Sequence, residues 1–166
     1  MPKHRLVLVR HAKAADGPID AERPLTGKGK SHAAAIGVWL AEAGLVPDRV
    51  AVSSARRAAQ TWAGAAERLD DGPPPTVDAR IYDNTVEALL TVVRETPEDV
   101  QTLAVVGHNP SIAELAGVLD DGDGDPAARK KLEAGFPTGC VAVFELTTPF
   151  DELEPGTATL RAFAVP

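Results

Sequence analysis

Short, mainly apolar runs predict three strands, of which the first is expected to be buried on both faces. The runs cover residues 6–9 (LVLV), 50–52 (VAV) and 102–106 (TLAVV). Continuous apolar runs of this length are typical of strands inside a parallel sheet, whereas a half-exposed strand alternates apolar and polar residues. Two further segments near the end of the chain, residues 140–146 and 157–165, are predicted to be closing strands.

Between the strands, apolar residues recur three and four positions apart, which is the spacing of one face of a helix. In the first half of the chain this pattern predicts a helix that begins after the N-cap Thr26 and ends at Gly44. A second helix is expected directly after the strand 50–52, with Ser53 and Ser54 as its cap.

The second half of the chain is predicted to hold three more helices. One covers residues 86–93, the next follows the cap Asn109 with Pro110 in the first helical position, and a short third one ends near residue 134. Residues 80–84 are interpreted as a loop after a short edge strand. Three strand–helix units dominate this order, so the fold class is α/β, with a three-layer α/β/α arrangement around a mostly parallel central sheet.

Length and composition fit one domain. The chain has 166 residues, of which 44% are hydrophobic, and this is enough to bury a core without disulfides. No internal repeat or linker divides it, so residues 1–166 are predicted to form a single domain. The one cysteine, Cys140, excludes a disulfide framework and a cysteine-rich zinc module. No segment approaches the ~20 apolar residues of a membrane helix.

The charge balance narrows the class of partner. Lys and Arg number 17 and Asp and Glu number 24, which gives a net charge of −7. Nucleic acids and anionic membrane surfaces attract concentrated positive charge, so neither is expected as a partner. The apolar run 6–9 is too short for a signal peptide and is cut off by Arg10 and His11. We therefore expect a cytoplasmic protein.

Polar and cationic residues follow the three predicted inner strands. Arg10 and His11 follow the first strand. A segment that contains Arg57 follows the second strand, and His108 follows the third. The carboxyl ends of parallel strands are where ligand sites gather in an open α/β sheet, so these residues are expected to meet in one cleft. Arginines, histidines and helix N-termini all favour an anion, and phosphate fits the arginine fork best.

These segments carry motifs that resemble those of the histidine phosphatase superfamily, which also contains the phosphoglycerate mutases. The motifs are LVRHAK at 8–13, ERPLTGKG at 22–29, SSARRAAQT at 53–61 and GHNP at 107–110. Ala12 stands where glycine is usual, and Ala12-Lys13 together with the Arg-Pro-Leu loop resembles the SixA-type phosphohistidine phosphatase branch. Ser54 stands where proline is common. The resemblance runs in order from residue 5 to about residue 120.

The resemblance implies a role for each matched residue. His11 is the nucleophile, which forms a phosphohistidine intermediate as a neutral imidazole. Arg10, Arg57 and His108 hold the phosphoryl oxygens and stabilise the charge of the transferred group. Further candidates for substrate binding are the backbone of Thr26 or Gly27 and the side chain of Arg23. Because arginines and imidazoles supply the positive charge, no metal ion and no cofactor are expected.

The general acid is the least distinct part of the pattern. Relatives that act on phosphate esters place a carboxylate after the second helix, because an alkoxide leaving group needs a proton. Here the candidates are Asp83 and Glu87, and Asp83 is preferred because Glu87 also fits the solvent face of a helix. A phosphohistidine substrate has an imidazole leaving group, which departs more easily and needs a strong acid less.

Three functions are compatible with these residues. The first is a metal-independent phosphatase whose partner is a protein phosphorylated on histidine. The second is a phosphatase of the same superfamily for small phosphorylated metabolites. The third is a non-catalytic domain that binds a phosphorylated ligand, and the presence of both histidines and both arginines speaks against it, because binding alone requires no nucleophile.

Overall fold

The structure, a computed structural model, describes residues 3–166, so residues 1 and 2 of the predicted domain lie outside the described residues. Its strands are β1 (His4–Arg10), β2 (Arg49–Val52), β3 (Thr76–Val77), β4 (Thr102–Gly107), β5 (Val141–Leu146) and β6 (Ala158–Ala164). They form one sheet in the order β3-β2-β4-β1-β5-β6. The first four run parallel, β5 is antiparallel to β1, and β6 is antiparallel to β5. The sheet is therefore mixed and mostly parallel.

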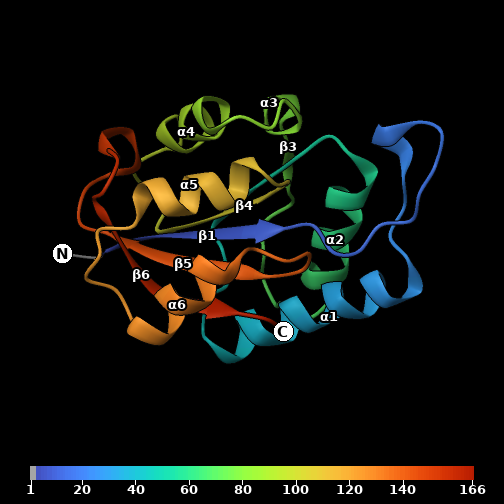
Figure 1. The fold of residues 1–166 in the computed structure, drawn as a ribbon, viewed down its shortest axis with the longest axis horizontal. Helices are drawn as coiled ribbons and strands as arrows, with labels where there is room; N and C mark the ends of the chain where they lie inside the picture. The colour runs from blue at the N-terminus through green and yellow to red at the C-terminus, as the bar shows by residue number, and fades with distance from the viewer. Residues whose placement is uncertain (1–2) are drawn as a thin grey trace.

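Helices cover both faces of this sheet (Figure 1). They are α1 (Gly27–Glu42), α2 (Arg56–Ala66), α3 (Ala79–Tyr82), α4 (Val86–Arg94), α5 (Ser111–Leu119) and α6 (Pro126–Ala134), with two 3₁₀ turns, η1 (Asp20–Glu22) and η2 (Phe150–Glu152). Helices α1 and α2 pack on one face, and α4, α5 and α6 pack on the other. The expected α/β class with three layers is confirmed.

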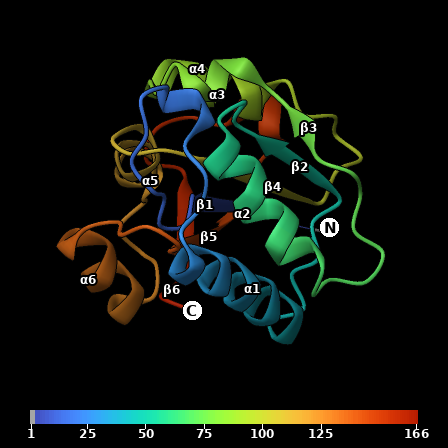
Figure 2. The ribbon, with the colours of Figure 1, turned by 90° about the vertical axis from the view of Figure 1, so that its right-hand side faces the viewer.

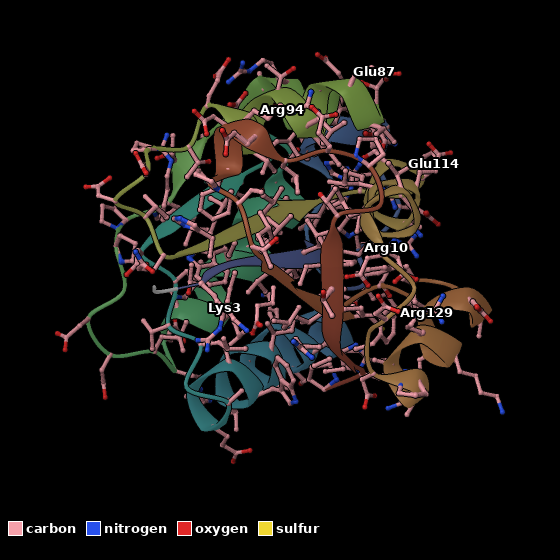
Figure 3. All side chains as sticks on the ribbon, turned by 90° about the vertical axis from the view of Figure 1, so that its left-hand side faces the viewer. Lys3, Arg10, Glu87, Arg94, Glu114 and Arg129 are labelled. Carbon is pink, nitrogen blue, oxygen red and sulfur yellow. The ribbon has the colours of Figure 1, made fainter. Side chains whose placement is uncertain are left out.

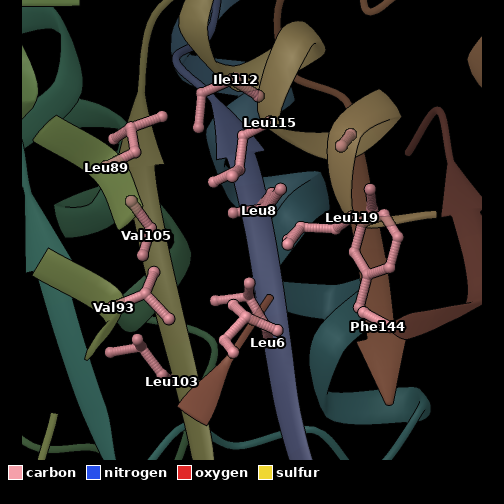
Figure 4. Close-up of a cluster of buried hydrophobic side chains, with 14 of the residues drawn as sticks. Leu6, Leu8, Leu89, Val93, Leu103, Val105, Ile112, Leu115, Leu119 and Phe144 are labelled. Atoms are coloured by element: carbon pink, nitrogen blue, oxygen red, sulfur yellow. The ribbon is translucent and has the colours of Figure 1, made fainter. Parts of the chain in front are cut away.

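The core consists of two apolar layers that the sheet separates. Alternate residues of β1 point to opposite faces, with Leu6 and Leu8 in one layer and Val7 and Val9 in the other, and all four are fully buried. This is why the run 6–9 is continuously apolar rather than alternating. Figure 4 shows Leu6 and Leu8 among side chains from α4, α5 and β5.

The structure corrects three local expectations. Residues 79–82 form the short helix α3 rather than a loop, because the Asp78 side chain accepts the N–H of Arg80 and caps a helical turn. Helix α5 begins at Ser111, so Pro110 is the N-cap residue and not the first helical one. Helix α2 has Ala55 as its N-cap residue, without a side-chain cap from the two serines.

Candidate active site

Three strand ends are aligned at one edge of the sheet. The register pairs Arg10 of β1 with Gly107 of β4, and Val52 of β2 with Val106 of β4. The residues that follow these strand ends therefore come together at the carboxyl edge of the sheet, as the sequence predicts. Figure 2 looks onto this side of the molecule, where the loop between β1 and α1 crosses in front of the sheet.

His11 lies at the buried end of the site, and 8% of its surface is exposed. Its Nδ1 lies 2.7 Å from the backbone oxygen of Ala12. A carbonyl oxygen only accepts, so Nδ1 carries the hydrogen and donates it. The lone pair of the imidazole is therefore on Nε2, which makes Nε2 the nucleophilic atom.

The surroundings of His11 keep its ring neutral. Burial lowers its pKa, the hydrogen bond to the backbone of Ala12 opposes this, and the positive charges of Arg57, Arg10 and Arg23 lower it further, so that the pKa of His11 is about 4. At neutral pH the imidazole is thus unprotonated at Nε2, which is the state that nucleophilic attack requires.

His108 lies beside His11, with the ring centroids 5.2 Å apart. It is 4% exposed, and its Nε2 is 2.7 Å from the Oγ of the fully buried Ser53. Burial, followed by the proximity of His11 and of Arg57, lowers the pKa of His108 to about 3. Two neutral imidazoles therefore share the site.

Two arginines flank the histidines. Arg57 is in the first turn of α2 and only 7% exposed, whereas its neighbour Arg56 is exposed. This difference agrees with the choice of Arg57 as the phosphate ligand. Arg10 donates from Nη1 to the backbone oxygen of Phe136 at 3.0 Å, which holds its guanidinium in the half-buried end of β1.

The site contains buried donors that no other described residue accepts. They are Nε of Arg10, Nε of Arg57 and Nδ1 of His108. Buried donors are rarely left without a partner in proteins, and those that are often mark a ligand site. Cationic and imidazole donors of this kind suit the oxygens of a phosphoryl group.

A hydroxyl group joins the loop that contains His11 to α2. The Oγ1 of Thr61 accepts the backbone N–H of Ala12 at 2.9 Å and donates to the backbone oxygen of Arg57 at 2.7 Å. The side chain of Gln60 accepts the N–H of Leu25 at 2.7 Å. Thr61 thus fixes the position of the loop that contains His11 relative to Arg57, and Gln60 attaches the segment before α1 to α2.

The last part of the chain, which matches no motif, also supports the site. The N–H of Gly139 is 3.0 Å from the backbone oxygens of both Arg10 and His11. The Nδ2 of Asn109 donates to the oxygen of Phe136 at 2.9 Å, the same oxygen that holds Arg10. Residues 136–139 therefore support the segment that contains Arg10 and His11.

The further substrate-binding candidates Thr26, Gly27 and Arg23 lie between the end of β1 and the first turn of α1. Thr26 caps α1, and its backbone N–H donates to Lys13 at 3.0 Å, which leaves Gly27 as the candidate donor of that pair. Arg23 donates to the backbone oxygen of Ala15 at 2.9 Å and lies close enough to His11 to lower its pKa.

The two acid candidates lie on the helical segment 79–94. Asp83 is the exposed C-cap residue of α3. Glu87 is exposed on α4, where Figure 3 shows it pointing outward. The residue of this segment that reaches the histidines is Tyr82, whose ring meets that of His108 edge-on at 5.8 Å. The role of Asp83 as a proton donor stays a prediction.

Two residues of the site were missed by sequence reasoning. The carboxylate of Asp20 lies 3.1 Å from Nη2 of Arg57 and accepts the hydroxyl hydrogen of Tyr82 at 2.5 Å. Neither residue belongs to a matched motif, and a loop aspartate carries no periodic signal. The only available sign was Tyr82 itself, the one tyrosine of the chain, next to the candidate Asp83.

Within residues 3–166, no three His, Cys, Asp or Glu side chains lie together in a way that could hold a metal ion. In the same residues, no helix has the length and apolar character to cross a membrane.

The chain is similar to proteins of one superfamily. Residues 6–87 match the model of the histidine phosphatase superfamily, branch 1. An uncharacterized protein of Mycobacterium tuberculosis is 35% identical over 161 residues, which cover 95% of this chain and 99% of that protein.

Solved structures agree with this match. A candidate phosphohistidine phosphatase SixA of Nakamurella multipartitia is 32% identical with a TM-score of 0.87, over 99% of this chain and 96% of that one. A protein histidine phosphatase SixA complexed with tungstate is 25% identical with a TM-score of 0.78, over 96% and 95% of the two chains. A phosphoglycerate mutase of Plasmodium falciparum, 17% identical with a TM-score of 0.65 over 99% and 92%, shares the fold. With this likeness in sequence and structure, and with the two histidines and two arginines gathered at one edge of the sheet, the chain belongs to the histidine phosphatase superfamily.

Proposed function

We propose that this protein is a phosphatase that removes the phosphoryl group from phosphohistidine on another protein, through a phosphohistidine intermediate on its own His11. The observation that carries the proposal is the state of His11: it is neutral, its Nδ1–H is bound to Ala12, and its Nε2 is free. A binding domain has no need of a histidine prepared for attack.

The reaction has two steps. In the first, Nε2 of His11 attacks phosphorus while the bond from phosphorus to the leaving group breaks, and Arg10, Arg57 and His108 stabilise the phosphoryl oxygens. In the second, water attacks phosphorus, the bond from phosphorus to Nε2 breaks, and its electron pair returns to the imidazole. Inorganic phosphate leaves and His11 is regenerated.

The state of the carboxylate at the site favours phosphohistidine as the substrate. Hydrogen bonds from Tyr82 and Arg23 hold the pKa of Asp20 well below its usual range, so this carboxylate is ionised and has no proton to give. An alkyl phosphate needs a proton on its leaving oxygen, whereas an imidazole leaves with much less help. The likeness to SixA phosphatases supports the same substrate class.

The proposal is tested with a panel of substrates compared by kcat/KM. The panel contains a protein phosphorylated on histidine, a phosphohistidine peptide, an aryl phosphate and sugar phosphates, and His11→Ala serves as the inactive control. The phosphorylated protein should be the best substrate. A preference for sugar phosphates would instead indicate a phosphatase for small metabolites. Phosphate binding without turnover of any substrate would indicate a binding domain. The cytoplasm stays the expected compartment.

A further inference from the structure

Asp20 is held at the site by three different side chains. Its carboxylate accepts hydrogen bonds from Nη2 of Arg57 at 3.1 Å, from Nη1 of Arg23 at 3.1 Å and from the hydroxyl of Tyr82 at 2.5 Å. Its backbone oxygen accepts a further bond from Nη1 of Arg57 at 2.8 Å. Such a set of contacts fixes both the position and the orientation of a side chain that sits on a loop.

This carboxylate lies on the solvent side of the site. The side chain of Asp20 is 53% exposed, whereas His11 and His108 are buried. Arg57 is also buried, and it donates a hydrogen bond to the carboxylate of Asp20. In Figure 2 the loop that contains η1 lies outermost at this edge of the sheet. Asp20 is thus the exposed partner of Arg57, whereas His11 lies at the buried end of the site.

Arg57 can hold Asp20 and a phosphoryl group together. A guanidinium has five N–H groups, and Asp20 uses one on Nη1 and one on Nη2. The Nε–H of Arg57 is buried and has no partner among the described residues. Three N–H groups of Arg57 remain, one each on Nε, Nη1 and Nη2, and they are available to phosphoryl oxygens while the ion pair with Asp20 persists.

We propose that Asp20 is the general base of the second step, the hydrolysis of the phosphohistidine on His11; this inference rests on the proposed function. Displacement at phosphorus is in line, so the attacking water must approach opposite the bond to Nε2. Because His11 is at the buried end, water arrives from the solvent side, where Asp20 is. As the bond from oxygen to phosphorus forms, one proton of the water passes to the carboxylate, and the exposed side of Asp20 then releases it to solvent.

The charge state of Asp20 agrees with this role. The hydrogen bonds from Tyr82, Arg23 and Arg57 lower the pKa of Asp20, so the carboxylate is ionised before the reaction starts. A phosphoryl group that is hydrogen-bonded to Arg57 brings negative charge next to Asp20, and a nearby like charge raises the pKa of a carboxylate. Asp20 therefore becomes a better proton acceptor when the phosphoenzyme has formed. Tyr82 acts as a positioning residue, because it binds Asp20 and packs against His108.

The test measures the two steps separately. The enzyme is phosphorylated with labelled phosphoramidate, whose leaving group is ammonia, and the acid-labile label on the protein is followed by rapid quench. Asp20→Asn should form the phosphoenzyme but hydrolyse it on the order of 100-fold more slowly than the unmodified protein, so that label accumulates. Tyr82→Phe should accumulate less label than Asp20→Asn, since the base is present but less well oriented.

A matched control comes from the same loop. Asp16 is an exposed aspartate four positions before Asp20, and within residues 3–166 it forms no ion pair. Asp16→Asn should hydrolyse its phosphoenzyme at the normal rate. The Tm of Asp20→Asn is measured alongside, which separates a lost base from a lost fold.

The outcomes distinguish this inference from the proposed function. If no label appears on His11 in any variant, the proposed function is wrong. If label appears and Asp20→Asn hydrolyses it normally, only the assignment of Asp20 is overturned. Tighter binding of phosphate in Asp20→Asn with unchanged hydrolysis would show that Asp20 merely competes for Arg57, and accumulation of label in Asp83→Asn instead would assign the base to Asp83.

Discussion

The hydroxyl group of Ser53 donates its hydrogen to Nε2 of His108, 2.7 Å away. The direction follows from the other contact of Ser53, whose Oγ already accepts the N–H of Ala55 at 3.2 Å. If the Oγ of Ser53 also accepted a hydrogen from Nε2 of His108, the hydroxyl hydrogen of this fully buried serine would have no acceptor among residues 3–166. The hydrogen of His108 is therefore on Nδ1, the atom left for a phosphoryl oxygen.

Ser53→Ala should weaken catalysis by releasing this orientation of His108. A hydrogen bond of this type contributes about 1 kcal/mol, so kcat/KM should fall about fivefold. Ser54→Ala is the control, because Ser54 is exposed, and it should leave kcat/KM unchanged. An equal loss in both variants would mean that the serines act only through the start of α2.

Arg57→Ala should be far more harmful than Arg56→Ala. Removing a fixed charge donor costs on the order of 3–4 kcal/mol in transition-state stabilisation, and Arg57 is buried at the site while Arg56 is exposed. The values of kcat/KM toward an aryl phosphate check this difference, with the Tm of each variant as the measure of folding. Similar losses at both positions would contradict the choice of Arg57.

The stability of the protein should fall as the pH is lowered from about 6.5 to about 4. The pKa values of His11 and His108 are about 4 and about 3 in the folded protein, compared with ~6.5 in an unfolded chain. The unfolded chain therefore binds more protons in this window, and the free energy of unfolding decreases with decreasing pH. Urea unfolding at pH 7 and pH 5 measures the effect.

The double variant His11→Gln, His108→Gln is the control for this pH dependence. It should lose less stability between pH 7 and pH 5 than the unmodified protein, because its folded and unfolded states no longer differ in these two protons. An identical pH dependence in the two proteins would show that neither histidine is held neutral by the fold.

Asp83→Asn should affect substrates according to their leaving groups. If Asp83 gives a proton to an ester oxygen, alkyl phosphates should be slowed much more than aryl phosphates, since a general acid contributes ~10²–10⁴-fold and helps poor leaving groups most. Turnover of phosphohistidine should fall less than about tenfold. Glu87→Gln is measured alongside, and efficient alkyl phosphate turnover that collapses in either variant would favour a phosphatase for small metabolites.

Activity should not depend on a divalent metal ion. Arg10 and Arg57 supply the positive charge that a metal ion would otherwise provide to the phosphoryl group, and His108 supplies a further donor. The rate after chelation and dialysis should equal the rate before it. A loss that added magnesium or zinc restores would contradict the assignment of these side chains.

The sequence predicted those parts of the site that depend on strand ends and on motifs. Burial on both faces makes β1 and β4 continuously apolar, and their register then brings His11 and His108 together. The contact of Asp20 with Tyr82 spans 62 positions of the chain and depends on the path of an irregular loop. No pattern of hydrophobic spacing records such a path, so the contact could not be predicted.

The short helix α3 was missed for a similar reason. Four residues are too few to show a helical period, and the turn is instead fixed by local and tertiary bonds. Arg80 pairs with Asp78 at 2.7 Å and with Glu95 at 2.9 Å, which connects the start of α3 to the end of α4. Asn84 then binds the backbone of Asn109 at 2.8 Å, and so holds the His108 loop from the other side.

The hydroxyl of Thr61 couples the thermal motion of α2 to that of the loop that contains His11. Because one hydroxyl binds the backbone of both Ala12 and Arg57, a small rocking of α2 against the sheet carries this loop with it. The spacing between the attacking nitrogen and the guanidinium is then insensitive to vibration of the helix as a whole. Thr61→Val, which keeps the shape but not the hydroxyl, would let the two drift independently, so the alignment needed for attack would be sampled less often.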